Sequence, residues 1–293
     1  MNTEFICPDA VRINKYDCLR ECRMSNRCLS KRTLGYIAVE REWKGSPSVT
    51  QLLSGTRQKY LEIIKDYAID PQNLLFAMLG SGVHLMQENH TPEGDLAEDR
   101  LTLGYVNGAF DYYDSETQTL YDTKTYGSYK IAKAMGYYEK WEFTGVYVKG
   151  PKKGQNKFER RWVPGGYKDR FDLAVQLNCY RLMLENLGHP VKQMLCEVIC
   201  KDGGTFMAKQ RGIDRIGYLV EINRISNTWI EKYFKEKSKR LLAALEKNQL
   251  PPPCSKKESW DGRKCKGYCP VWEFCDRGRE INNQKTGEEE TND

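Results

Sequence analysis

The sequence predicts an α/β protein in which helices flank one central sheet. Segments of strand-like composition alternate with long amphipathic segments through residues 46–247. The 293 residues are 40% hydrophobic and 29% charged, which is ordinary for a soluble chain with a substantial core. Cysteine-rich segments stand at both ends. We therefore expect a four-cysteine module (1–32), an α/β core (46–247), a second four-cysteine module (254–279) and a disordered acidic tail (280–293).

The first predicted elements are two helices and a hairpin. Residues 46–69 have helical spacing of apolar residues, with Ser48 or Thr50 as the N-cap, and a second helix begins at Pro71. Residues 104–126 predict a β-hairpin, because two runs rich in Tyr, Val, Phe and Thr surround the polar stretch 114–118.

The second half predicts three more helices and a strand. A short helix is expected over residues 130–141, and a stronger one follows Asp169 or Asp172 as its cap and ends at Gly188. Residues 192–204 alternate like a strand, and residues 224–246 have the pattern of a long amphipathic helix.

The predicted hairpin carries two carboxylates and a lysine. In a symmetric hairpin Asp111 lies opposite Asp122, and like charges opposite each other destabilise a sheet unless a cation binds between them. Lys124 is two residues beyond Asp122, so it projects from the same face. This arrangement can hold a divalent ion and steady a phosphate, which indicates phosphodiester hydrolysis. The alternative is a surface salt bridge on a solvated hairpin.

Three further residues are candidates for the same site. His84 lies on the helix that begins at Pro71, and its imidazole can complete an oxygen-rich site for Mn²⁺ or Mg²⁺. Gln176 and Tyr180 are four residues apart and share one helix face. Each of these side chains also has a purely structural interpretation.

A basic segment follows the hairpin. Residues 149–170 contain eight basic and two acidic residues, interleaved with aromatic residues. Backbone neutralisation and base stacking hold single-stranded nucleic acid, so this segment is interpreted as a loop that grasps a strand. A solvated loop is the alternative. The DNA-binding candidates are Lys152, Lys153, Lys157, Arg160, Arg161 and Trp162.

Eight of the eleven cysteines form two quartets with identical C-x10-C-x3-C-x5-C spacing. They are Cys7, Cys18, Cys22 and Cys28, and Cys254, Cys265, Cys269 and Cys275. Four thiolates suit tetrahedral zinc, and they also suit an iron–sulfur cluster. Two separate sites are expected, and one cluster shared by both ends of the chain is the alternative.

Taken in order, these motifs resemble the RecB-like branch of the PD-(D/E)XK nucleases. The resemblance covers about residues 46–200 and rests on G-x3-H-x3-E, G-x-x-D, D-x-K and Q-x3-Y, together with the text QLNCYRLMLENLG. The matching residues are Gly80, His84, Glu88, Gly108, Asp111, Asp122, Lys124, Gln176 and Tyr180.

The resemblance implies a restriction-endonuclease-like mixed sheet flanked by helices. It implies His84, Asp111 and Asp122 as ligands of Mg²⁺ or Mn²⁺ and Lys124 as the catalytic lysine. Gln176 and Tyr180 would support the site and contact DNA. Several CRISPR-associated RecB-like and AddB-type members hold a [4Fe-4S] cluster whose ligands often include a C-x2-C-x5-C run. The segment CKGYCPVWEFC resembles that run, with one extra residue in the first gap.

The expected function is a divalent-metal-dependent DNA nuclease of phage or bacterial recombination, repair or defence. It is expected to be an exonuclease or to prefer single strands. No G-x4-GK[ST] phosphate loop is present, so a helicase or single-strand-annealing protein is the expected partner. The alternatives are an inactive nucleic-acid-binding module and a metal-cluster interaction or redox scaffold. No membrane span or signal sequence is evident, so a cytoplasmic location is expected.

Overall fold

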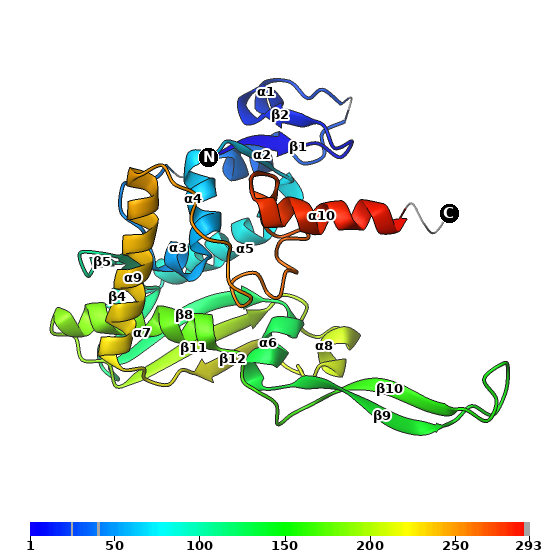
Figure 1. Cartoon of the computed structure of the whole chain (residues 1–293). Coiled ribbons are helices and arrows are strands. Elements are labelled where there is room, and N and C mark those ends of the chain that lie inside the picture. Colours follow the sequence, from blue (N-terminus) through cyan, green and yellow to red (C-terminus); the bar gives the residue numbers. More distant parts are fainter. Residues whose placement is uncertain (25, 40–41, 290–293) are drawn as a thin grey trace. The chain divides into compact units, whose positions relative to one another are not determined.

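The computed structural model describes residues 1–24, 26–39 and 42–289 (Figure 1). The chain divides into two compact units. The first contains Met1–Val83, Arg100–Gly108 and the chain from Asn227 onward, and the second contains His84–Asp99 and Ala109–Ser226. Residues 46–247, expected as one core, therefore contribute to both units.

The first unit combines a small mixed sheet with helices. Strand β1 (Asn2–Ile6) is the central strand, antiparallel to β2 (Arg12–Asn14) and parallel to β3 (Tyr67–Ile69). The helices are α1 (Lys15–Arg20), α2 (Lys31–Ala38), α3 (Val49–Leu53), α4 (Thr56–Ile64), α9 (Asn227–Glu246) and α10 (Asp276–Glu289), with a 3₁₀ turn η1 (Trp272–Phe274). Helix α5 (Pro71–Glu88) belongs to this unit as far as Val83, and its last turns, from His84, belong to the second unit. A two-stranded ribbon pairs β5 (Arg100–Thr102) with β6 (Asn107–Ala109).

The helix expected over residues 46–69 is two helices and a strand. Ser48 caps α3 in a capping box with Gln51, which confirms the first of the two caps considered. The helix stops at Ser54, and α4 begins after Gly55. A side chain at Gly55 would collide with Cys254, because its Cβ would lie 2.3 Å from that sulfur atom. Glycine at this break lets the C-terminal cysteines approach the start of α4.

Residues 280–293 are the tail for which disorder is expected from the sequence. Helix α9 confirms the long helix predicted over 224–246, and α10 continues to Glu289. Residues 290–293 of the expected tail lie outside the described residues.

A five-stranded mixed sheet is the centre of the second unit. Its strand order is β12-β11-β8-β7-β4, and β8 and β11 are parallel neighbours in the middle. The strands are β4 (Leu96–Ala97), β7 (Tyr112–Asp114), β8 (Thr119–Tyr126), β11 (Gln193–Cys200) and β12 (Gly217–Glu221). Helix α7 (Phe171–Asn186) packs on β8 and β11, with α6 (Ser128–Met135) and α8 (Phe206–Gln210) nearby.

The predicted hairpin is present as β7 and β8, joined by a turn over residues 115–118. Tyr112 pairs with Tyr121, so the register continued by one residue sets Asp111 opposite Asp122. Helix α7 is buried almost all round, and Gly188 follows its end with a φ of 89°. Its N-cap is Arg170 rather than either predicted aspartate, and Asp172 lies in the first turn.

The basic segment expected as a loop is half of a long antiparallel ribbon. Strand β9 (Tyr138–Val146) pairs with β10 (Asn156–Val163), and only residues 147–155 form the tip. Residues 138–141, expected as the end of a helix, belong to β9. The ribbon extends away from the five-stranded sheet of its unit (Figure 1). We call it the arm.

The mixed α/β class is therefore confirmed, but the described residues form four sheets where one was expected. None of the described helices combines the length and the apolar composition needed to cross a membrane.

Candidate metal centre and nucleic-acid interface

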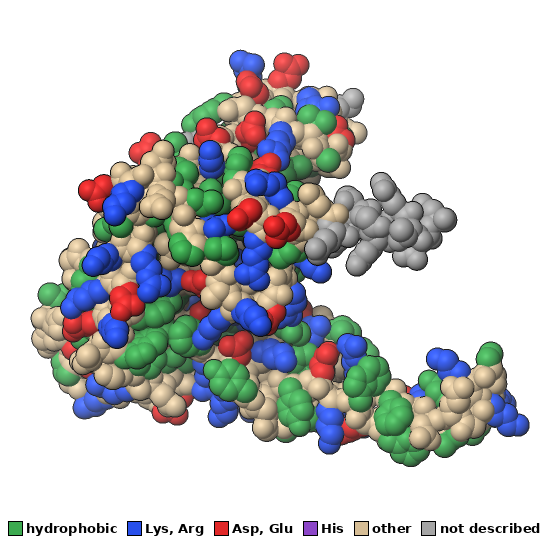
Figure 2. Space-filling model, viewed as in Figure 1, with side chains coloured by type: hydrophobic (Ala, Val, Ile, Leu, Met, Phe, Trp, Pro, Cys, Tyr) green, Lys and Arg blue, Asp and Glu red, His purple; other side chains and the backbone are tan. Residues whose placement is uncertain are grey.

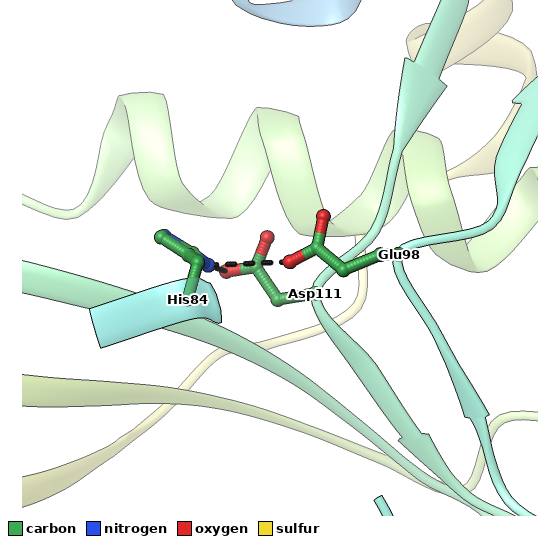
Figure 3. A group of neighbouring side chains, drawn as sticks. All are labelled: His84, Glu98 and Asp111. Carbon is green, nitrogen blue, oxygen red and sulfur yellow. Dashed lines mark ion pairs between the residues drawn. The ribbon is translucent and has the colours of Figure 1, made fainter. Parts of the chain in front are cut away.

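Three side chains from different elements meet at the edge of the five-stranded sheet. His84 comes from the last turns of α5, Glu98 directly follows β4, and Asp111 directly precedes β7 (Figure 3). The Nδ1 atom of His84 is 3.4 Å from Oε1 of Glu98 and 3.6 Å from Oδ2 of Asp111. Among the described residues, this is the group of three in which all the ligand atoms lie within 4.8 Å of one another.

Glu98 was missed by the sequence analysis. Its φ is 54°, in the left-handed region that a non-glycine residue seldom adopts, and its backbone N–H donates to the carbonyl of Asp111. Strained backbone of this kind clusters at functional sites. The pairing of β4 with β7 brings Glu98 beside Asp111, so the sequence near Glu98 contains no signal that predicts the contact.

The two carboxylates of this group are partly buried. Burial raises the pKa of Asp111, while Lys124 and His84 lower it. Burial also raises the pKa of Glu98. His84 opposes this rise, and the nearby charge of Glu88 adds to it. Anionic forms held in such surroundings are stabilised by a nearby cation, so the electrostatics favour a bound positive ion.

Asp122 and Lys124 form a pair on β8, as predicted. The ammonium of Lys124 donates to Oδ1 of Asp122 over 2.7 Å. Asp122 is fully buried, and burial raises its pKa to about 6, with Lys124 opposing the rise and Asp111 adding to it. Burial would lower the pKa of Lys124, but Asp122 and then Asp111 outweigh it and the pKa is raised. Lys124 is therefore a cation at neutral pH.

Helix α7 holds Asp122 from the other side. Gln176 donates from Nε2 to Oδ1 of Asp122 over 3.2 Å, and the same Nε2 lies 3.4 Å from the Tyr180 hydroxyl. This confirms that Gln176 and Tyr180 share one face. The geometry joins Gln176 to Asp122 directly, whereas the predicted role of Asp122 as a metal ligand stays a prediction.

A cavity of about 340 Å³ opens at the group of His84, Glu98 and Asp111. Its lining is acidic: the carboxylates of Glu88, Glu98, Asp111 and Glu197 are joined there by two imidazoles, His84 and His90. Glu197 accepts hydrogen bonds from Gln87 and from the Thr123 hydroxyl. Asp122 and Lys124 alternate with Thr123 along β8 and are not part of this lining. Asp111 lines the cavity, and its charge also acts on Asp122 and Lys124.

The arm presents aromatic side chains on one face. Trp141, Phe143 and Phe158 are at least half exposed, at 60%, 57% and 50%. Phe143 pairs with Phe158 edge to face at 5.9 Å, and the guanidinium of Arg160 lies over Trp141 at 4.9 Å. Figure 2 shows hydrophobic side chains along the arm and basic side chains near its end.

The predicted DNA-binding residues have three different positions on the arm. Lys152 and Lys153 are exposed at the tip. Lys157, Arg160 and Arg161 lie on β10, where they form ion pairs with Glu159, Glu139 and Glu142. Trp162 is half-buried at the base, where it packs against Tyr129 at 5.4 Å. The tip lysines and the aromatic face are therefore the parts best placed to meet a ligand.

The C-terminal cysteines gather near the start of α4. The cysteines are close enough to act on one another electrostatically. Cys275 raises the pKa values of Cys254 and Cys265, and Cys265 raises the pKa of Cys269. The buried guanidinium of Arg57 lies 3.6 Å from the Cys275 sulfur. Burial raises the pKa values of Cys254, Cys265 and Cys269, and nearby Lys264 lowers all three. Burial outweighs Lys264 at each of these cysteines, so a metal ion would have to displace the protons of the thiols when it binds.

If His84, Glu98 and Asp111 hold an ion, Glu98→Gln is expected to lower the affinity for Mn²⁺, because the substitution removes one of the two carboxylates and keeps the side-chain length. Loss of a supporting group at a metal site costs about 10–100-fold in affinity, and the effect here should be at least that large. Calorimetric titration measures it, with Glu116→Gln in the exposed hairpin turn as the control. Equal Mn²⁺ affinity in wild type and Glu98→Gln would remove Glu98 from the site.

Comparisons with known proteins add little. No protein-family model matches the chain, and no curated protein matches it. A solved structure, the crystal structure of SSO0001, aligns with 14% sequence identity, covering 84% of this chain and 92% of that chain, at a TM-score of 0.39. That score is too low to show a common fold.

Proposed function

We propose that this protein is a divalent-metal-dependent DNA nuclease that hydrolyses phosphodiester bonds. One observation carries the proposal: His84, Glu98 and Asp111 lie together, beside the Asp122–Lys124 ion pair. Asp122 and Lys124 are on β8, and Asp111 directly precedes β7, the other strand of the same hairpin. A solvated hairpin has no need to gather buried carboxylates at one place, whereas a metal site requires it.

The donor set fits Mn²⁺ or Mg²⁺. Two carboxylates and one imidazole suit a hard or borderline divalent ion, and the side chains of His84 and Glu98 keep 30% exposure, so an ion can enter. A bound ion of this type would polarise the scissile phosphate and lower the pKa of a water molecule.

The residues of the chain supply the remaining chemistry. Lys124 is cationic at neutral pH, so it can neutralise charge that develops on the phosphate or donate a proton to the leaving oxygen. Gln176 fixes the carboxylate of Asp122, and Asp122 in turn fixes the Lys124 ammonium. Gln176 and Asp122 are therefore positioning residues for Lys124, in addition to any role of Asp122 toward the metal.

The finer fold assignment is part of this proposal. A restriction-endonuclease-like core is supported by the β7–β8 hairpin that carries both aspartates and by α7, which packs on β8 and carries Gln176 and Tyr180. The C-terminal quartet is proposed as a further metal centre, holding zinc or a [4Fe-4S] cluster. Arg57 and Gly55 support it, because one lies beside the thiol of Cys275 and the other makes room for Cys254.

The arm is proposed to hold the nucleic-acid strand. Residues 138–163 contain seven basic and three acidic residues, which favours an anionic ligand. Exposed rings on one face offer stacking platforms to unpaired bases, and lysines at the tip can neutralise phosphates. This combination favours single strands over duplex, since paired bases do not expose their faces.

Trp141→Ala with Phe158→Ala is expected to weaken binding of single-stranded DNA about tenfold or more, since stacking contributes about 1–3 kcal/mol per base. Fluorescence anisotropy in EDTA measures the affinity without cleavage. Thr144→Ala, at the register shift of the arm, is the matched control, because it removes neither a ring nor a charge. An unchanged Kd for the double variant would show that the aromatic face does not contact DNA.

The central test is a cleavage assay on end-labelled single- and double-stranded DNA with Mg²⁺, Mn²⁺ or EDTA. Metal-dependent cleavage is expected, with faster turnover of the single strand. The product ladder distinguishes exonuclease from endonuclease action. A metal-loaded protein that binds DNA but cleaves neither substrate would overturn the proposal and favour an inactive binding module.

A further inference from the structure

The N-terminal cysteines surround one small cavity. Cys7, Cys18, Cys22 and Cys28 all line it, and its volume of about 10 Å³ is close to the space that one water molecule or one ion occupies. None of the C-terminal cysteines lines this cavity.

The elements around the cavity bring the four cysteines together from separate places. Cys7 directly follows β1, Cys18 lies on α1, and Cys22 and Cys28 lie between α1 and α2. Arg27 donates to the carbonyl of Cys18 over 2.7 Å, which fixes the segment that returns across the site. All four therefore come from within the first 28 residues, so no other part of the chain is needed to complete the set.

The apolar core next to the cavity is small. Its buried members are Phe5, Cys18, Leu34 and Ile37, and one of these is itself a cysteine of the quartet. Seven partly buried apolar residues pack around these four, and a core of this size gains stability from a metal ion. All four cysteines are free thiols, and three of them are only partly buried.

We propose that Cys7, Cys18, Cys22 and Cys28 bind a zinc ion in a site of their own, separate from the C-terminal quartet. The space suits a single ion, and four thiolates are a common set of ligands for structural zinc. Sulfur atoms in a tetrahedral zinc site are about 3.8 Å apart, for a Zn–S distance of about 2.3 Å. No three of these sulfurs lie within 4.8 Å of one another among the described residues, so the four thiolates have to come closer together when they bind zinc.

The site connects the N-terminus to the rest of the first unit. Strand β1, which ends at the residue before Cys7, pairs in parallel with β3, and Arg12 on β2 forms an ion pair of 2.6 Å with Glu273 in the C-terminal cysteine module. The zinc ion therefore maintains the position of a strand that holds β3 in its sheet. This role is independent of whether the protein cleaves DNA.

Metal analysis of the purified full-length protein, incubated with Zn²⁺ and desalted, tests the proposal. The double variant Cys7→Ser with Cys22→Ser is expected to contain one zinc ion per chain fewer than wild type, with unchanged iron. Cys179→Ala, at a buried thiol of α7, is the control and should match wild type. Equal zinc contents would overturn the site, and loss of iron with unchanged zinc would overturn its assignment to zinc.

A second measurement uses the unmodified chain, in case the double variant does not fold. Iodoacetamide labelling followed by mass spectrometry reports on Cys7, Cys22 and Cys28, which are partly exposed and react unless metal is bound. The zinc-loaded protein is expected to protect all three thiols, and a chelator should release that protection. Equal labelling before and after chelation would contradict the proposal.

Discussion

Replacing Lys124 by methionine is expected to slow DNA cleavage about 10²–10³-fold, the typical cost of removing one group that stabilises transition-state charge. Methionine keeps most of the side-chain volume and removes the ammonium that Asp122 holds at 2.7 Å. The fold should persist, because buried Asp122 already has a raised pKa and can become protonated once its counter-ion is absent. DNA affinity should persist as well, since the arm is untouched.

The measurement is a single-turnover cleavage rate at saturating Mn²⁺, beside the Kd for single-stranded DNA in EDTA. Lys192→Met is a matched control, because Lys192 is exposed just before β11, in the same unit. A lower rate with an unchanged Kd assigns Lys124 to the chemical step. Turnover equal to wild type would show that Lys124 has no part in the reaction.

The parts of the site that the sequence predicted depend on local geometry. The polar turn of the hairpin sets its register, so the opposition of Asp111 and Asp122 follows from counting residues on either side. Strand alternation places Lys124 with Asp122, and helical spacing places Gln176 with Tyr180. These relations require no knowledge of how distant segments pack.

The parts that sequence reasoning missed depend on long-range pairing. Glu98 reaches the metal group because β4 pairs with β7 and because a glutamate adopts a positive φ, and neither fact has a local signal. The arm was missed for another reason. Its tip is rich in Gly and Lys, which suggested a loop, and residues 138–141 continued a helical pattern. The cross-strand pairs Trp141–Arg160 and Phe143–Phe158 are apparent only once the two strands are aligned.

Asp111→Asn is expected to abolish metal-dependent stabilisation and to reduce cleavage more severely than any other single substitution at the site. Asp111 contacts both His84 and strand β8. Its Oδ2 atom lies 3.6 Å from Nδ1 of His84 and accepts a hydrogen bond from the backbone N–H of Thr123 over 2.6 Å. Asparagine retains an oxygen acceptor for Thr123 but lacks the negative charge that a divalent ion requires. Mn²⁺ affinity should therefore fall by more than about 100-fold, the upper range for loss of a merely supporting group.

Metal-free Asp111→Asn should be as stable as wild type or more stable. Burial raises the pKa of Asp111 in the folded protein, so its ionisation opposes folding. This cost is full above the raised pKa, declines as the pH falls through it, and is gone below the ordinary pKa of an aspartate. Asparagine is free of this cost at pH 7. Thermal unfolding with and without Mn²⁺ measures both effects, because a ligand that binds the folded state raises the Tm.

Asp114→Asn is the matched control for this experiment, since Asp114 lies three residues away and its carboxylate caps the hairpin turn outside the site. The control should keep the full Mn²⁺-induced rise in Tm. If the site sacrifices stability for metal binding, metal-free Asp111→Asn should have a Tm no lower than that of wild type. Its Tm should not rise when Mn²⁺ is added. If its Tm still rises with Mn²⁺ as in wild type, the ion binds elsewhere and the proposed metal centre is wrong.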